Sequence, residues 1–407
     1  MSPWQPKSLG EFLAAQPRDA EALVTPTGRL TYGELLQRSR DAAGAMHALG
    51  LRKGDHAAIL MGNDEHWLTL FYGAALLGAV TVPANTRFKA QELEYCLKQA
   101  DCKALFYAPR FLDIDYEAMV RDIRPKLPRL AHTVRAPELG AAPFVPGNAR
   151  PEDLLLIQFT SGTTAYPKGV MLTHDNMLRN AWAAGERMGV TPEDRYFNCR
   201  PFFHVGGSTL SALLCLVHGA CLVTLPSFEP GAALETMERE RCTLTSGNDT
   251  IFQMLMGHED FPRRKLVLRG GWAAAGPATM RRIIHVLGAK YICAAYGLSE
   301  ASPNVVMSDW RDPEELRVQG LATPHEIIID GTKVKASAGK SSFKRAVRLD
   351  EAEAAASQQI AALKAELDDD PAATSRRQLA ARERAQRQRL ERITKARATL
   401  HAIDQER

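Results

Sequence analysis

A run of small and hydroxyl residues ends in a lysine near the middle of the chain. Residues 159–170 read FTSGTTAYPKGV, in which the small residues are Ser161, Gly162, Thr163 and Thr164. Backbone N–H groups and hydroxyls in such a loop can converge on an anion, and Lys168 can add a point charge for the terminal phosphates of a nucleotide. The order differs from the Walker pattern, because Gly169 follows the lysine. A plain Ser- and Thr-rich surface hairpin is the alternative interpretation of this composition.

Three later segments carry further candidate residues. They read PFFHVGG at 201–207, RGGWAAAGP at 269–277 and AAYGLSE at 294–300. A lone histidine such as His204 in an apolar run is most often structural, and a lone glutamate such as Glu300 is most often solvated. Nothing in the sequence indicates a Ser/His/Asp triad, paired catalytic carboxylates or a metalloprotease motif.

An alternating order of helices and strands must position these segments. Apolar periodicity predicts helices over 30–49 (with Thr31 as its N-cap), 65–77, 90–99, 175–188 and 231–241. Short apolar runs predict strands over 57–61, 79–82, 104–107, 154–159, 242–246, 266–269 and 291–294. Residues 109–150, rich in proline and arginine, are expected to form a surface excursion. The rhythm indicates an α/β fold with parallel strands covered by helices on both faces.

The segment 159–170 closely resembles the signature of the adenylate-forming superfamily, the AMP-forming acyl-CoA synthetases. The family pattern is [YF]-T-S-G-T-T-G-x-P-K-G-V, and this chain departs from it at Ala165, where the family has glycine. The resemblance extends in the family's order over most of residues 8–324. It implies the family's large domain, with stacked mixed and parallel sheets flanked by helices. A methyl group at Ala165 would strain or displace the loop if that position needs a positive φ.

The resemblance also implies a site and a reaction. Residues Thr160 to Thr164 and Lys168 would hold the phosphates of ATP, and His204 would lie near the acyl and adenylate pocket. Residues 269–277, with Gly270 and Gly271, would line the acyl and adenine sites. Near the end of the series, Tyr296 and Gly297 would adjoin the adenine, Ser299 a phosphate, and Glu300 would help to hold Mg²⁺. The substrate carboxylate would attack the α-phosphate, and coenzyme A would then accept the acyl group.

The composition agrees with a cytoplasmic protein. The chain has 407 residues, of which 45% are hydrophobic, enough for two to three domains. Its seven cysteines are scattered and never spaced C-x-x-C, which argues against a disulfide framework or a zinc site. Neither an apolar run long enough for a membrane span nor a secretory signal is visible.

Charge divides the chain into two parts. Residues 1–324 contain 34 basic and 34 acidic residues, whereas 325–407 contain 17 and 13, so the later segment carries the whole net charge of +4. Residues 325–345 include DGTKVKASAG and resemble a strand of a DDE insertion-element transposase, with Asp330 as its first catalytic aspartate. Residues 346–407 are predicted to be a basic helical tail, a hairpin or a coiled-coil-like pair. A native helical extension of the enzyme is the alternative.

These features predict an impaired acyl-CoA synthetase. The aspartate that grips the ribose in the family, and its C-terminal domain with the adenylation lysine, have no counterpart after residue 324. The alternatives are a non-catalytic protein that binds nucleotide or acyl-adenylate, and DNA binding by the tail. The modest charge of the tail, with its acidic run at 368–370, disfavours nucleic acid as a partner. The apolar residues Phe202, Phe203, Val205 and Trp272 suit a fatty or aryl acid, and the oligomeric state stays open.

Overall fold

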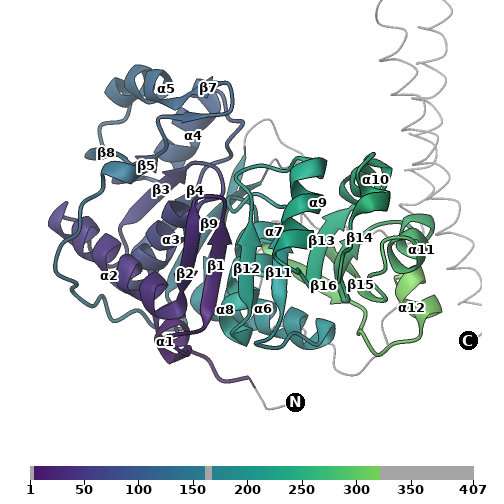
Figure 1. Ribbon diagram of the computed structural model, residues 1–407. Helices are drawn as coiled ribbons and strands as arrows, with labels where there is room; N and C mark the ends of the chain where they lie inside the picture. Colours follow the sequence, from purple (N-terminus) through teal and green to yellow (C-terminus); the bar gives the residue numbers. More distant parts are fainter. Residues whose placement is uncertain (1–3, 161–166, 321–407) are drawn as a thin grey trace, which may run out of the picture. The chain divides into compact units, whose positions relative to one another are not determined.

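The computed structural model describes residues 4–160 and 167–320. Its strands form two large sheets and one short hairpin (Figure 1). The eight-stranded sheet has the order β16 (Asn304–Met307), β15 (Tyr291–Gly297), β14 (Gly270–Ala274), β13 (Leu244–Asn248), β11 (Arg195–Asn198), β12 (Cys221–Thr224), β1 (Glu21–Thr25) and β2 (Gly28–Thr31). The six-stranded sheet has the order β10 (Lys168–Thr173), β9 (Leu154–Thr160), β4 (Val80–Pro83), β3 (His56–Leu60), β5 (Ala104–Tyr107) and β8 (His132–Arg135). The hairpin joins β6 (Arg110–Phe111) to β7 (Ile114–Asp115).

Both sheets are mixed, with antiparallel pairs only at their edges. The antiparallel pairs are β1 with β2, β15 with β16, and β9 with β10. Strands β11, β13, β14 and β15 run parallel to one another, so their carboxyl ends open at one edge of the sheet. In open α/β sheets this edge is where ligands bind.

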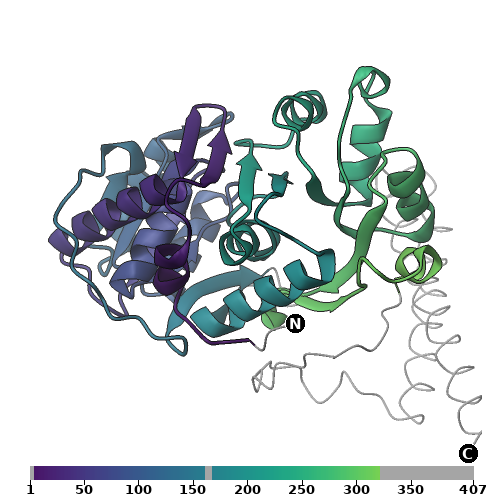
Figure 2. The ribbon, with the colours of Figure 1, turned by 60° about the horizontal axis from the view of Figure 1, so that its bottom comes forward.

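Helices fill the space between the sheets and cover their outer faces (Figures 1 and 2). The core shared by both sheets buries the apolar faces of α1 (Leu9–Ala15), α2 (Tyr32–Ala48), α3 (Glu65–Leu77), α6 (His174–Met188) and α8 (Leu214–His218). The far face of the eight-stranded sheet packs against α9 (Pro230–Arg239), α10 (Asp249–Gly257) and α11 (Pro277–His285). The far face of the six-stranded sheet packs against α4 (Ala90–Gln99) and α5 (Tyr116–Ile123).

The strands alternate their side chains between these cores. In β11, Tyr196 enters the shared core and Phe197 enters the core under α9 to α11. In β5, Phe106 enters the shared core and Leu105 faces the core under α4 and α5. Because successive side chains of a strand point to opposite faces, strands buried on both sides read as continuous apolar runs.

Local signals start and end the helices as the sequence predicts. Thr31 caps α2 in a capping box with Glu34, which confirms the predicted N-cap. Asp64 caps α3, and Gly78 ends it in the left-handed conformation. The helices predicted at 65–77 and 90–99 have those bounds.

Two expectations about the elements are wrong. The segment 109–150 contributes α5 and the edge strand β8, whose residues His132–Arg135 are at most half-buried and so carry no apolar run. The strand predicted at 266–269 begins instead at Gly270, because the glycine pair that reads as a turn forms the first two residues of β14. The tail predictions for 321–407 lie outside the described residues.

Candidate functional site

The proposed phosphate loop is bounded by an antiparallel strand pair. Lys168, the first residue of β10, pairs in register with Thr160, the last residue of β9. The side chain of Lys168 is exposed and has no ion-pair partner within the described residues. Residues 161–166, which include Ser161, Gly162, Thr163 and Thr164, lie outside the described residues. The structure therefore places the two ends of the loop side by side at the end of the β9–β10 pair, of which β10 is the edge strand of the six-stranded sheet.

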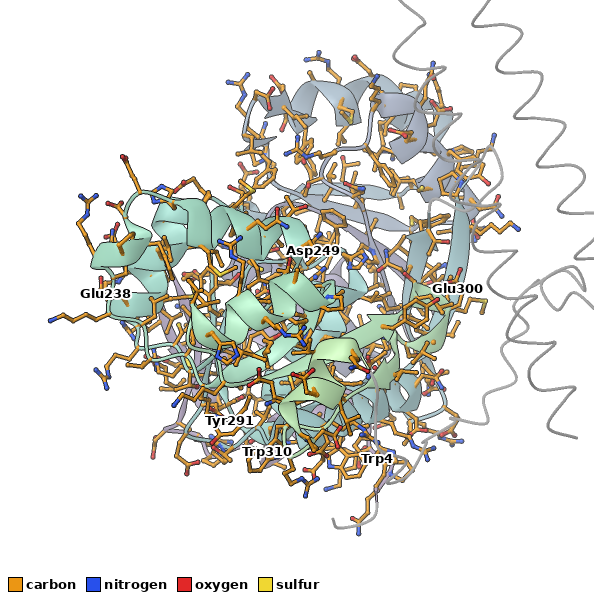
Figure 3. All side chains as sticks on the ribbon, turned by 90° about the vertical axis from the view of Figure 1, so that its right-hand side faces the viewer. Trp4, Glu238, Asp249, Tyr291, Glu300 and Trp310 are labelled. Atoms are coloured by element: carbon orange, nitrogen blue, oxygen red, sulfur yellow. The ribbon has the colours of Figure 1, made fainter. Side chains whose placement is uncertain are left out.

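Glu300 lies on a short turn just beyond the carboxyl end of β15. The turn is the 3-10 helix η5 (Ser299–Ala301), and Figure 3 shows Glu300 far from Tyr291, the first residue of β15. Asn180 of α6 holds the turn from both sides: its Nδ2 donates to the carbonyls of Ala301 (3.2 Å) and Asn304 (2.9 Å). Within the described part of the chain, the half-buried carboxylate of Glu300 has no hydrogen-bond or ion-pair partner.

The turn η5 packs against β10, so the fold brings together the strand that carries Lys168 and the turn that carries Glu300. These segments are over a hundred residues apart in the sequence: β10 belongs to the six-stranded sheet, and η5 connects β15 to β16 of the eight-stranded sheet. A free ammonium and a free carboxylate on adjacent elements are the groups that a nucleotide with Mg²⁺ requires, because Mg²⁺ in such sites takes one or two carboxylates and the substrate phosphates. No cluster of three or more acidic, histidine or cysteine ligands occurs in residues 4–160 and 167–320, and this mode of binding needs none.

Tyr296 and Gly297 are the last two residues of β15, at the end of the strand that leads into η5. The residue Tyr296 is 66% exposed, so its ring is free to stack on a planar ligand. A side chain at Gly297 would meet the carbonyl oxygen of Pro303 at 2.1 Å, which explains why glycine is required there. Ser299 is half-buried at the start of η5.

Gly270 and Gly271 lie at the beginning of β14, away from its carboxyl end at Ala274. Both are buried, and Gly271 has a φ of +126°. A Cβ atom on Gly271 would lie 1.8 Å from the carbonyl oxygen of Thr245 in β13. The close approach of two strands thus accounts for this glycine, and a ligand contact by either residue stays a prediction.

His204 caps the short helix α7 (Val205–Gly207) that follows β11. Its Nδ1 accepts a hydrogen bond of 3.0 Å from the backbone N–H of Gly206, so the neutral ring carries its proton on Nε2. The residue as a whole keeps an accessible part. Withdrawal from solvent, followed by the charge of Arg200, lowers the pKa of His204 to about 4. At neutral pH the ring is an uncharged hydrogen-bond donor at the carboxyl edge of the sheet.

Arg200, Asn63 and Asn180 are site residues that the sequence analysis missed. The guanidinium carbon of Arg200 lies 4.4 Å from the ring centroid of Trp272. Asn63, which follows β3 of the other sheet, accepts from the N–H of Phe202 (2.7 Å) and donates to the carbonyl of Arg200 (2.8 Å). Of these three residues, only Arg200 could have been noticed in the sequence, because it is the one charged residue in the otherwise apolar run RPFFHV.

A scan of protein families identifies residues 11–336 with the family described as AMP-binding enzyme. Among curated proteins, a putative acyl-CoA synthetase, YngI, of Bacillus subtilis is 34% identical over 77% of this chain and 65% of its own length. The mitochondrial medium-chain acyl-CoA ligase ACSF2 of Bos taurus is 32% identical over 78% of this chain and 60% of its own length. The chain thus spans about three fifths of the length of these relatives.

Solved structures show the same fold. The anthranilate CoA ligase AuaEII, in complex with anthranoyl-AMP, has a TM-score of 0.70 at 22% identity, over 75% of this chain and 63% of its own. The N-terminal domain of FACL13 from Mycobacterium tuberculosis has a TM-score of 0.66 at 24% identity, over 77% of this chain and 80% of its own. At this identity the likeness establishes the fold alone: an α/β adenylate-forming fold with mixed sheets flanked by helices.

The two-sheet fold thus places the chain in the adenylate-forming class of α/β folds. The chain belongs to the AMP-binding enzyme family, as its match over residues 11–336 establishes. Within the described residues, no helix combines the length and the apolar character needed to cross a membrane.

Proposed function

We propose that this chain binds ATP and a carboxylic acid at the carboxyl edge of the eight-stranded sheet, as the nucleotide-binding part of an AMP-forming acyl-CoA synthetase. The observation that carries the proposal is the carboxylate of Glu300, which has no partner among residues 4–160 and 167–320 and lies on a turn packed against β10, the strand that begins with Lys168. The names of the relatives, acyl-CoA synthetases and ligases, support the reaction class.

The proposed reaction joins a carboxylate to ATP, which gives an acyl-adenylate and pyrophosphate, and coenzyme A then accepts the acyl group. Lys168 and Thr160 to Thr164 would hold phosphates, and Ser299 would add a hydroxyl contact. Glu300 would hold Mg²⁺, which supplies positive charge against the phosphates when bound. Tyr296 and Gly297 would adjoin the adenine, and His204, as a neutral Nε2–H donor, would contact the adenylate or the acyl group.

Thioester formation by residues 1–407 alone is proposed to be severely reduced. Residues 337–407 lie outside the family match, and the sequence offers no counterpart there to the family's lysine-bearing domain. Adenylation and thioester formation use different arrangements of that domain in the family. We expect low pyrophosphate release and little acyl-CoA over a panel of fatty and aryl acids, and turnover at the rate of a complete synthetase would contradict this expectation.

Calorimetric titration of ATP with Mg²⁺ tests the site itself. Lys168→Ala and Glu300→Ala should each weaken binding by about 10- to 150-fold, because each removes a charged contact worth about 1.5–3 kcal/mol. Lys265→Ala and Glu259→Ala are matched controls: both residues are exposed on the segment between α10 and β14, and both variants should bind as the wild type does. Binding that neither Lys168→Ala nor Glu300→Ala changes would remove the proposed site.

A non-catalytic nucleotide-binding protein is the second candidate function. It predicts the same calorimetric result with no pyrophosphate release, so the two assays together separate the candidates. DNA binding by residues 326–407 is a separate proposal, tested by the salt dependence of DNA affinity in the full chain. Affinity that deletion of the basic tail leaves unchanged would overturn it.

A further inference from the structure

Arg200 is a charged side chain without a counter-charge in the described structure. It directly follows Cys199 and lies two residues beyond the end of β11, at the carboxyl edge. A guanidinium has five N–H donors, and within residues 4–160 and 167–320 none of those of Arg200 is bonded to a protein acceptor. Its Nε is fully buried, whereas the residue as a whole keeps an accessible part. The titratable groups that interact with its charge, the Cys199 thiol, the Tyr196 phenol and the His204 ring, are all neutral at physiological pH.

The surroundings of Arg200 fix the position of the guanidinium. The guanidinium carbon Cζ lies 4.4 Å from the ring centroid of Trp272, over the indole face. The Cδ and Nε atoms lie close to Gly206, where an added Cβ atom would be 3.0 Å from Cδ. The backbone carbonyl accepts from Asn63 Nδ2 and Asn198 Nδ2, both at 2.8 Å. A side chain held this firmly without an acceptor is arranged in advance for a ligand, because preorganisation lowers the entropy that binding must overcome.

A second buried donor points to the same kind of ligand. The Nε1–H of Trp272 is buried and has no acceptor within the described residues. Leaving a buried donor unpaired costs about 1–3 kcal/mol. An oxygen acceptor brought by a ligand to this corner would meet the accessible guanidinium nitrogens first, and a carboxylate would do so with two parallel charge-assisted bonds. The indole ring of Trp272 beside Arg200 suits the apolar part of an organic acid better than a bare polyphosphate.

We propose that Arg200 selects acyl substrates that carry an oxygen acceptor on the part of the molecule remote from the reacting carboxylate, most strongly a second carboxylate. The proposal rests on the proposed function, because it assigns the substrate class of the same site. Trp272 supplies the apolar face of this subsite, and Asn63 and Asn198 are positioning residues that hold the backbone of Arg200. Lys168 on β10 and Glu300 on η5, which are proposed to hold the phosphates and Mg²⁺, are not part of this subsite.

Three non-hydrolysable acyl-adenylate analogues test the proposal by calorimetry with the full chain. The probes are the hexanoyl, 5-oxohexanoyl and 5-carboxypentanoyl sulfamoyl adenosines, which differ only at the end of the acyl group. The wild type should bind the carboxylate analogue at least about tenfold more tightly than the hexanoyl analogue, with the ketone between them. Arg200→Leu should reduce both preferences to about one without changing the affinity for AMP.

A second variant, Arg200→Lys, keeps the test decisive if Arg200→Leu fails to fold. Arg200→Lys retains a charge and loses the planar fork, so it should retain only part of the preference for the carboxylate analogue. Equal affinity of the wild type for all three analogues would overturn the proposal and leave the proposed function intact. A loss of AMP affinity in Arg200→Leu and Arg200→Lys equal to their loss for every analogue would also overturn it, because the arginine would then serve the nucleotide. Failure of the wild type to bind AMP or ATP would count against the proposed function instead.

Discussion

The Nδ2 atom of Asn63 lies 2.8 Å from the carbonyl oxygen of Arg200 and donates a hydrogen bond to it. Asn63 follows β3 of the six-stranded sheet, and Arg200 follows β11 of the eight-stranded sheet. The side chain of Asn63 also accepts from the N–H of Phe202 at 2.7 Å. One buried amide therefore joins the two sheets at the place where the segment with His204 begins.

Replacement of Asn63 by alanine should lower the free energy of unfolding by about 1–3 kcal/mol. The substitution leaves the buried N–H of Phe202 without a partner, and the Arg200 carbonyl keeps only its hydrogen bond from Asn198 Nδ2. Urea denaturation followed by circular dichroism measures the change. Asn85→Ala is the matched control: among the described residues the side chain of Asn85 accepts one hydrogen bond, from the N–H of exposed Arg87, and the control should lose less than about 1 kcal/mol. Equal losses in the two variants would contradict a special role for Asn63.

The sequence predicts five of the twelve α-helices in the described residues (α2, α3, α4, α6 and α9) and several of the buried strands, but few of the contacts that build the candidate site. Helix α3 was predictable because its apolar residues and the flanking Asp64 and Gly78 are local signals. The edge strand β8 was not, because its exposed side chains leave no apolar pattern. The partners of Asn63 and Asn180 lie more than a hundred residues away, and no local pattern encodes such pairs. The family resemblance predicts that Lys168 and Glu300 share a site; their elements β10 and η5 are packed together, and the shared site itself stays a prediction.

Gly271→Ala should be among the most destabilising single changes in the described chain. Its φ of +126° is a conformation that L side chains rarely adopt, and the new methyl carbon would lie 1.8 Å from the Thr245 carbonyl oxygen. We expect a loss of about 3 kcal/mol or more, or failure to accumulate as folded protein, measured by thermal denaturation.

The control for this variant is Gly276→Ala. Gly276 has a φ of −72° at the start of α11, and a Cβ atom there would have open space around it. The melting temperature of this variant should stay close to that of the wild type. A Gly271→Ala protein that folds normally and only loses ligand affinity would favour direct ligand contact over the strand-packing explanation.

Buried His174 should make stability fall as the pH falls from about 6.5 to about 4. Burial lowers the pKa of His174 to about 4, and its Nδ1 accepts from the N–H of Leu9 at 3.1 Å. The unfolded chain binds a proton on this residue near pH 6.5, whereas the folded chain resists protonation until about pH 4. The unfolded state therefore binds more protons in this window, and stability is lost as the pH decreases, by up to about 3 kcal/mol.

The variant His174→Asn isolates this effect, because an amide oxygen can accept from Leu9 and does not titrate in this range. Unfolding free energies measured between pH 7.5 and 4.5 should show a shallower slope for His174→Asn than for the wild type. The slope should not vanish, since the pKa values of His204 and His218 are also lowered by burial. Identical slopes in the two proteins would show that His174 does not carry the dependence.

All seven cysteine thiols should resist modification in the folded protein. Every cysteine is buried and unpaired, and burial raises the pKa of each thiol, to about 11 for Cys199 and to about 12 for Cys96, Cys221 and Cys293. Since the thiolate is the reactive form, both access and ionisation are withheld at pH 7.5. Ellman's reagent should label less than one thiol in the native protein and all seven in denaturant, with no reductant added. Rapid labelling of Cys199, which donates its thiol proton to the Ser246 carbonyl oxygen at 2.8 Å, would mean that the segment before Arg200 opens in solution. That result would also undermine the rigid placement of the guanidinium on which the proposed selectivity depends.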